Sequence, residues 1–352
     1  MASLPSSPSP PFAEAARFWA KLGFVSFGGP AGQIAILHRE VVERRRWLGD
    51  DEFTRALNFC MLLPGPEALQ LAIFLGWKLH GIRGGLVAGL GFVLPAVLLL
   101  FALSYVYVAH GSLTWVSALL HGLKAAVVAL VLQAMVRIAR RALQSSLHVV
   151  LAAASFVALE FARVPFPVVL LLAAAVGAYV ARHAASNERV AADAAPARGA
   201  QTARIAAVGL ALWLLPLLVV ATTLGGASLW TAIYLFFTKA ALVTFGGAYA
   251  VLGYVTSQLV DKLAWVTADQ SVAGLALAET TPGPLIIVLQ FMGFMAGWNQ
   301  PGPLSPLGSA LLAGALATWA TFLPSFLFIL LGAPYVERLT RNARIAAALG
   351  AI

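Results

Sequence analysis

Long uninterrupted runs of apolar residues dominate the chain. Each of six runs is long enough, or nearly so, to cross the hydrocarbon core of a bilayer, which takes about 20 helical residues. In lipid every backbone N–H and C=O must be paired within the protein, and no run alternates like a transmembrane β-strand. The pattern therefore predicts an all-α polytopic membrane protein. Its expected spans are residues 84–109, 115–136, 147–162, 164–181, 205–223 and 307–333.

Composition supports the same class. Hydrophobic residues make up 61% of the 352 residues and charged residues 11%, whereas a soluble domain carries about 25% charged residues. The net charge of +9 reflects Lys and Arg gathered in loops, as the positive-inside rule requires. We therefore expect contact with membrane lipid and no nucleic-acid partner. The only cysteine, Cys60, excludes an intramolecular disulfide and a cysteine metal cluster.

Two parts of the chain repeat each other at an offset of 218 residues. Residues 18–29 read FWAKLGFVSFGG, and residues 236–247 read FFTKAALVTFGG. The register continues without a gap to a Pro-Gly-Pro segment at 64–66 and another at 282–284. Chance similarity between apolar helices would not hold lysine, Gly-Gly and Pro-Gly-Pro in one register. The chain is therefore an internal duplication.

The predicted domains follow from this duplication. We expect a cytoplasmic N-terminal tail (1–16), a first repeat (17–181), a polar cytoplasmic linker (182–204) and a second repeat (205–352). The tail begins MASLPSSPSPP and lacks the hydrophobic core of a signal peptide.

Charge predicts how the repeats are oriented. The connection between Gly-Gly and Pro-Gly-Pro is rich in arginine in the first repeat but holds only Lys262 in the second. Short basic loops stay in the cytoplasm, so the two connections should lie on opposite sides. If the Gly-Gly and Pro-Gly-Pro segments enter and return on one side, five spans separate the two connections. Because five is an odd number, the connections then lie on opposite sides, as the charge pattern predicts. We expect two inverted-topology repeats whose broken or re-entrant helices meet near the membrane midplane.

These breaks are the expected substrate site. Proline interrupts a helix, and a half-helix N-terminus inside the membrane presents free N–H groups and positive partial charge to an anion. The alternative is a kink that only shapes packing. The lysines upstream of each Gly-Gly could join the site or snorkel to the interface. The candidate substrate-binding residues are Lys21, Gly28, Gly29, Gln33, Asn58, Pro64, Gly65, Pro66, Lys239, Gly246, Gly247, Thr280, Thr281, Pro282, Gly283 and Pro284.

Ionisable residues within apolar segments are further candidates. Glu67 follows the first Pro-Gly-Pro and Glu279 precedes the second. Either carboxylate could couple proton movement to transport, or serve as a structural hydrogen-bonding group. His121 and Lys124 interrupt a predicted span, and Lys124 should meet a carboxylate such as Glu160 or face the cavity. The chain has no Walker-type loop, nucleophile–base pair or metal-ligand cluster of recognisable spacing. We therefore expect no enzyme activity, metal or cofactor.

The motifs resemble those of the chromate transporter family in its long, two-domain form. The first repeat carries FGGPAGQ at 27–33, HREVVE at 38–43 and LLPGPE at 62–67. The second carries FFTK at 236–239, TFGGAYA at 244–250 and ETTPGP at 279–284. The resemblance implies export of chromate across the bacterial inner membrane, chromate resistance, and sulfate as a competitor. Both chain ends are expected in the cytoplasm, and a homodimer is one option for the oligomeric state.

The energetics agree with export. A dianion leaving a negative-inside cell gains about 4.6 kcal/mol per 100 mV. Membrane potential alone could drive export, with proton exchange as an addition. The alternative is a proton-coupled importer or exchanger of sulfate or a related oxyanion. A membrane scaffold or sensor would leave the paired helix breaks unexplained.

Overall fold

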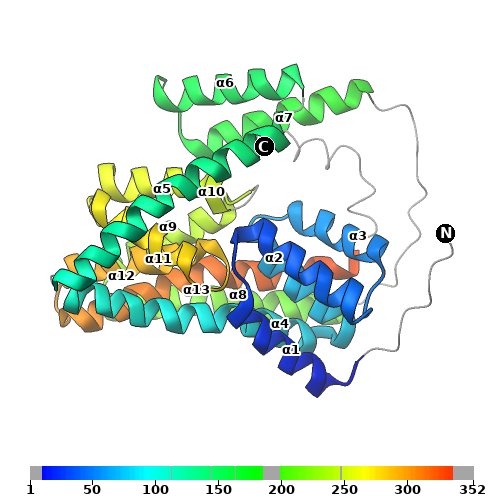
Figure 1. Cartoon of the computed structure of the whole chain (residues 1–352), viewed down its shortest axis with the longest axis horizontal. Helices are drawn as coiled ribbons and strands as arrows, with labels where there is room; N and C mark the ends of the chain where they lie inside the picture. Colours follow the sequence, from blue (N-terminus) through cyan, green and yellow to red (C-terminus); the bar gives the residue numbers. More distant parts are fainter. Residues whose placement is uncertain are drawn as a thin grey trace.

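The computed structural model describes residues 10–111, 113–143, 145–162, 164–184, 199–245 and 248–335. Within them the regular structure is helical (Figure 1). The helices are α1 (Phe12–Val25), α2 (Gly29–His38), α3 (Asp50–Met61), α4 (Glu67–His110), α5 (Thr114–Ala142), α6 (Ser146–Glu160), α7 (Phe166–Ala184), α8 (Gly199–Thr223), α9 (Leu229–Leu242), α10 (Ala248–Ser257), α11 (Ala268–Thr280), α12 (Val288–Asn299) and α13 (Pro306–Gly332). Shorter turns are the π-helical η1 (Arg39–Arg44) and η2 (Gln258–Lys262), and the 3-10 helices η3 (Leu285–Ile287) and η4 (Ala333–Tyr335).

Four helical segments are long and apolar enough to cross a membrane. They are Glu67–His110, Thr114–Gln133, Gly199–Thr223 and Pro306–Tyr335. Ser146–Glu160 and Val168–Gly177 are shorter apolar helices at two further predicted spans. The predicted all-α polytopic membrane protein is confirmed.

Helix α4 is two helical arms joined by a tight turn. His80 and Gly81 have non-helical backbone angles, with φ of −140° and +61°. The first arm (67–79) then packs against the second arm (82–110) at backbone contact. A Cβ built on Gly76 would lie 2.4 Å from the carbonyl oxygen of Gly84. The second arm matches the predicted span 84–109.

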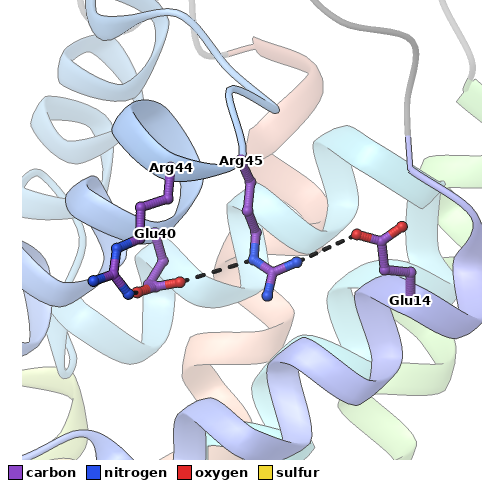
Figure 2. Close-up of polar contacts among 4 residues, drawn as sticks. All are labelled: Glu14, Glu40, Arg44 and Arg45. Atoms are coloured by element: carbon purple, nitrogen blue, oxygen red, sulfur yellow. Dashed lines mark hydrogen bonds and ion pairs between the residues drawn. The ribbon is translucent and has the colours of Figure 1, made fainter.

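Helices α1 and α2 form a hairpin that returns to its own starting side. After Gly28, which has a left-handed φ of +90°, α2 and η1 run back along α1. Arg45 then reaches Glu14 in the first turn of α1, with 3.3 Å between Nη1 and Oε1 (Figure 2). The Trp47 ring meets the Phe18 ring at 5.1 Å. The Gly-Gly segment is thus the tip of a helical hairpin.

A second hairpin joins α3 to the first arm of α4. Its tip is Pro64-Gly65-Pro66, and its open end is closed by an ion pair of 2.7 Å between Lys78 and Glu52. His80, at the end of the first arm, contacts the Pro10 carbonyl through Nε2 at 2.8 Å. The two hairpins therefore open toward the same end of the molecule.

The second repeat builds the same two hairpins. The Phe236 and Trp265 rings meet at 6.0 Å, as their counterparts Phe18 and Trp47 do. The π-helical turn recurs, and Ala264 has a positive φ of 49° where Arg46 has 53°. Such agreement at one offset shows that the duplication extends to backbone conformation.

The two repeats run in opposite directions. The second arm of α4 packs antiparallel to α13, because Gly85 faces Leu330, Gly89 faces Phe326 and Phe101 faces Gly314. Figure 1 shows α1–α3 gathered at one end of the molecule and α9–α12 toward the other. Helix α8 packs along α13, while α6 and α7 lie together on one side (Figure 1).

We predict that matched positions of the two repeats face opposite sides of the membrane. In a Cys60→Ala background, Asp50→Cys and Ala268→Cys place exposed thiols at positions 218 residues apart. A membrane-impermeant maleimide should label one in intact cells and the other only in inverted vesicles. Labelling of both from the same side would contradict the inverted arrangement.

Candidate functional site

The four hairpin tips meet at the centre of the molecule and exchange backbone hydrogen bonds. The N–H of Gly65, in the first Pro-Gly-Pro, donates to the Thr244 carbonyl at 2.7 Å. The N–H of Gly283, in the second, donates to the Ser26 carbonyl at 2.8 Å. Gly65 and Gly283 are repeat counterparts, as are Ser26 and Thr244. Each repeat therefore satisfies the broken helix of the other.

The residues whose carbonyls accept these bonds also carry hydroxyl groups that shape the tips. Ser26 Oγ donates to the Leu22 carbonyl at 2.7 Å, and Thr244 Oγ1 donates to the Ala240 carbonyl at 2.6 Å. Both bonds run back four residues, the pattern by which Ser and Thr bend a helix. The bends direct the carbonyls of residues 26 and 244 toward the opposite repeat.

Only glycine fits between the two prolines. Gly65 and Gly283 have φ of +134° and +104°. A Cβ at Gly65 would lie 2.6 Å from Ser325 Oγ, and one at Gly283 would lie 2.5 Å from the Ala96 Cβ. Ala96 and Ser325 each follow the proline of a matched Phe-x-x-Pro or Phe-x-Pro sequence, in the long helices of opposite repeats. The tips are thus clamped between α4 and α13.

Polar side chains break this symmetry. Gln33, which is 1% exposed, donates from Nε2 to the Gly283 carbonyl and, at 3.4 Å, to the Ser26 carbonyl. Its repeat counterpart is Val251. Gln70 donates to the Pro64 carbonyl at 2.8 Å, and Gln290 to the Val97 carbonyl at 2.9 Å. Among the described residues the Oε1 atoms of all three glutamines lack a hydrogen-bond partner.

A tyrosine that sequence reasoning did not select lies at the same centre. Tyr249 donates a short hydrogen bond from its hydroxyl to Glu279 Oε1. The same hydroxyl is 3.7 Å from where a Cβ on Gly29 would stand. Tyr249 belongs to the TFGGAYA segment, where it is the only ionisable side chain. An ionisable side chain in this otherwise non-ionisable motif was the feature of the sequence that could have identified Tyr249 as a candidate.

The candidate substrate-binding residues divide by exposure. The exposed candidates are Lys21, Gly28, Asn58, Lys239 and Thr280, and the half-buried ones are Gly29 and Pro64. The buried candidates are Gln33, Gly65, Pro66, Thr281, Pro282, Gly283 and Pro284. The hydroxyls of Thr280 and Thr281 donate to carbonyls of their own helix. Gly246 and Gly247 lie outside the described residues. The coupling candidates Glu67 and Glu279 are both half-buried.

His121 and Lys124 lie away from the tips, in a pocket of about 220 Å³ beside the start of α11. Lys124 Nζ is 2.5 Å from Asp269 Oδ1. Lys124 therefore meets a carboxylate, as expected, but this is Asp269 and not Glu160, because α5 packs against α11 and brings Lys124 to the first turn of that helix. Sequence reasoning did not select Asp269, because a pairing between residues 145 positions apart leaves no local signal.

Comparison with known proteins accords with this architecture. The sequence profile described as Chromate transporter matches residues 13–178 and 231–352, two stretches that begin at repeat counterparts. The chain belongs to the chromate transporter family.

Several relatives match along nearly the whole chain. A Pseudomonas aeruginosa protein named chromate transport protein is 37% identical over 96% of this chain and 76% of its own length. A Cupriavidus metallidurans protein with the same name is 29% identical over 99% of this chain and 83% of its own. An uncharacterized transporter of Methanocaldococcus jannaschii is 24% identical over 92% and 76%. No solved structure matches.

We predict that Gly283→Ala destabilises the protein. The new methyl group would clash with Ala96 and require an unfavourable φ, at a cost of about 2–5 kcal/mol in the free energy of unfolding. Thermal unfolding in detergent should show a clearly lower midpoint. The control is Gly253→Ala, where a Cβ meets no atom within 4 Å. Equal midpoints for the two variants would contradict the clamped tip.

We also predict that Gln33→Val, which installs the residue of the other repeat, weakens the tip. Without the amide, the carbonyl of Gly283 loses a buried donor, at a cost of about 1–3 kcal/mol. Gln201→Val, at an exposed position of α8, is the matched control. The unfolding midpoint of the Gln33 variant should fall below that of the control. Indistinguishable midpoints would show that the Gln33 bonds contribute nothing.

Proposed function

We propose that the protein is a secondary transporter that exports chromate across the bacterial inner membrane and so confers chromate resistance. The observation that carries the proposal is the reciprocal bonding of four hairpin tips from two antiparallel repeats. Inverted repeats with discontinuous helices are the architecture by which many transporters present one central site alternately to each side. This is a non-enzymatic role.

The central region has the properties that an oxyanion needs. The N-terminal ends of α2 and of the first arm of α4 begin at the tips, and a helix N-terminus carries positive partial charge and unpaired N–H groups. Backbone groups bind a tetrahedral dianion without the tight hold of several fixed cations, so release remains easy. Chromate is the substrate in the names of the Pseudomonas aeruginosa and Cupriavidus metallidurans relatives, and sulfate is the expected competitor.

The orientation follows from charge. The arginine-rich end of the molecule, which holds Arg39, Arg44, Arg45, Arg46 and Arg55, is assigned to the cytoplasm. Five crossings then separate it from the corresponding end of the second repeat. With this orientation both chain ends and the linker 182–204 are cytoplasmic. The functional units are then the repeats 17–181 and 205–352.

Membrane potential suffices as a driving force. A dianion gains about 4.6 kcal/mol per 100 mV when it leaves the cell, which supports a gradient above about 10³. The contact of Glu279 with Tyr249 supports a second candidate, proton-coupled uptake or exchange of sulfate or a related oxyanion. Uptake runs against the same field and needs coupled protons.

Flux in sealed liposomes tests both. Purified protein should move labelled chromate when a potassium-diffusion potential is imposed, with a direction that reverses when the potential is reversed. Protein-free liposomes give the leak. Flux that requires a pH gradient and ignores voltage would favour the proton-coupled candidate. Absence of protein-dependent flux under every gradient would refute transport of chromate.

A further inference from the structure

The pair formed by Tyr249 and Glu279 stands at the N-terminal end of α2. Glu279 lies in the last turn of α11, three residues before the second Pro-Gly-Pro, and Tyr249 lies in the first turn of α10. Their hydrogen bond joins two tips of the second repeat. Through the Tyr249 hydroxyl, the pair also approaches Gly29, the first residue of α2 in the other repeat.

The N-terminal end of α2 has no capping side chain, because its N-cap is Gly28. A helix N-terminus attracts negative charge, and a carboxylate close to it is stabilised. The Tyr249 hydroxyl, which approaches Gly29, holds the Glu279 carboxylate and so links it to this helix end.

Gln33 gives an independent sign that the tip receives another group. It lies in the second turn of α2, and its Nε2 donates hydrogen bonds to the carbonyls of Ser26 and Gly283. Its Oε1 is buried and has no partner among the described residues. Buried polar atoms are normally paired, so this acceptor is suited to a group that arrives with a proton, such as a protonated carboxyl or a hydrogen-bonded water.

Comparison of the repeats separates these groups from the scaffold. The counterparts of Gln33, Tyr249 and Glu279 are Val251, Ala31 and Met61. The backbone bonds between tips are present twice, but this polar set occurs once. A group needed only to build the tips would be expected in both copies. The asymmetry points to a role in what the site binds.

We propose that Glu279 is an internal competitor of the transported oxyanion: its ionised carboxylate, positioned by Tyr249, occupies the N-terminal end of α2, and the oxyanion binds there only after Glu279 is protonated. This rests on the proposed function. Binding of one oxyanion is then linked to uptake of one proton. Tyr249 is a positioning residue, because it acts through the carboxylate.

The charged contact between α5 and α11 lies at the opposite end of α11 from Glu279. The elements packed against α11 are α5, α12, η3 and α4. In α12 and η3 no side chain is ionisable. From α5, Lys124 pairs with Asp269, ten residues before Glu279 and hence about 15 Å away along the helix. In α4, Tyr107 lines that same pocket and Glu67 begins the helix. From α10, Tyr249 contacts the carboxylate and Tyr254 lies further along.

The test is the pH dependence of chromate binding. Equilibrium dialysis of labelled chromate with the purified full-length protein in lipid nanodiscs is carried out at alkaline pH values, where chromate is entirely a dianion. One linked proton lowers the affinity of the wild-type protein about tenfold per pH unit. Glu279→Gln should bind chromate with an affinity independent of pH, and Tyr249→Phe should shift the wild-type profile along the pH axis. Glu160→Gln, an exposed position on α6, should retain the wild-type profile.

Three outcomes would overturn the proposal. These are pH-independent binding by the wild-type protein, an unchanged pH profile in Glu279→Gln, and loss of chromate binding in Glu279→Gln with an unchanged unfolding midpoint. Absence of chromate binding by the wild-type protein would instead refute the proposed function itself. Wild-type binding without the pH dependence refutes only the competition.

Discussion

The structure depends on two backbone hydrogen bonds that cross between the repeats. A helix that stops inside the membrane leaves N–H and C=O groups unpaired, and the hydrocarbon offers no water to satisfy them. Here the N–H of Gly65 takes its acceptor from residue 244, and the N–H of Gly283 takes its acceptor from residue 26. Neither repeat could bury its own tip alone. In this chain each repeat supplies the acceptor for the N–H of the other's Pro-Gly-Pro glycine, and the tips fix how the two halves dock.

The long helices enforce this docking. The second arm of α4 and α13 run antiparallel, and each presents a small residue, Ala96 or Ser325, to the glycine of the opposite Pro-Gly-Pro. Because that space admits no side chain, the tips cannot slide without moving an entire helix. Such coupling is what alternating access requires, since opening one end must close the other.

Function enters where the symmetry fails. The backbone at the tips is nearly identical in the two repeats. The positions that match Gln33, Tyr249 and Glu279 in the other repeat, however, carry the apolar residues Val251, Ala31 and Met61. A symmetric scaffold can offer two equivalent half-sites, but a single substrate needs one. In the proposal above, the polar groups gathered beside α2 form the single place where charge and protons are exchanged. Lys124 and Asp269 form a separate polar contact toward the outer end of α11.

The sequence by itself determined the helical class, the duplication, the positions where helices are interrupted and the opposite direction of the repeats. These rest on local properties, namely long apolar runs, Pro-Gly-Pro, Gly-Gly and the unequal arginine content of two loops. Only the tertiary structure decided the exchange between Gly65 and residue 244, the pairing of Lys124 with Asp269, the exposure of Lys21 and Lys239, and the contact of Tyr249 with Glu279. Partners of this kind are set by how helices rotate and pack, and no spacing along the chain encodes that rotation.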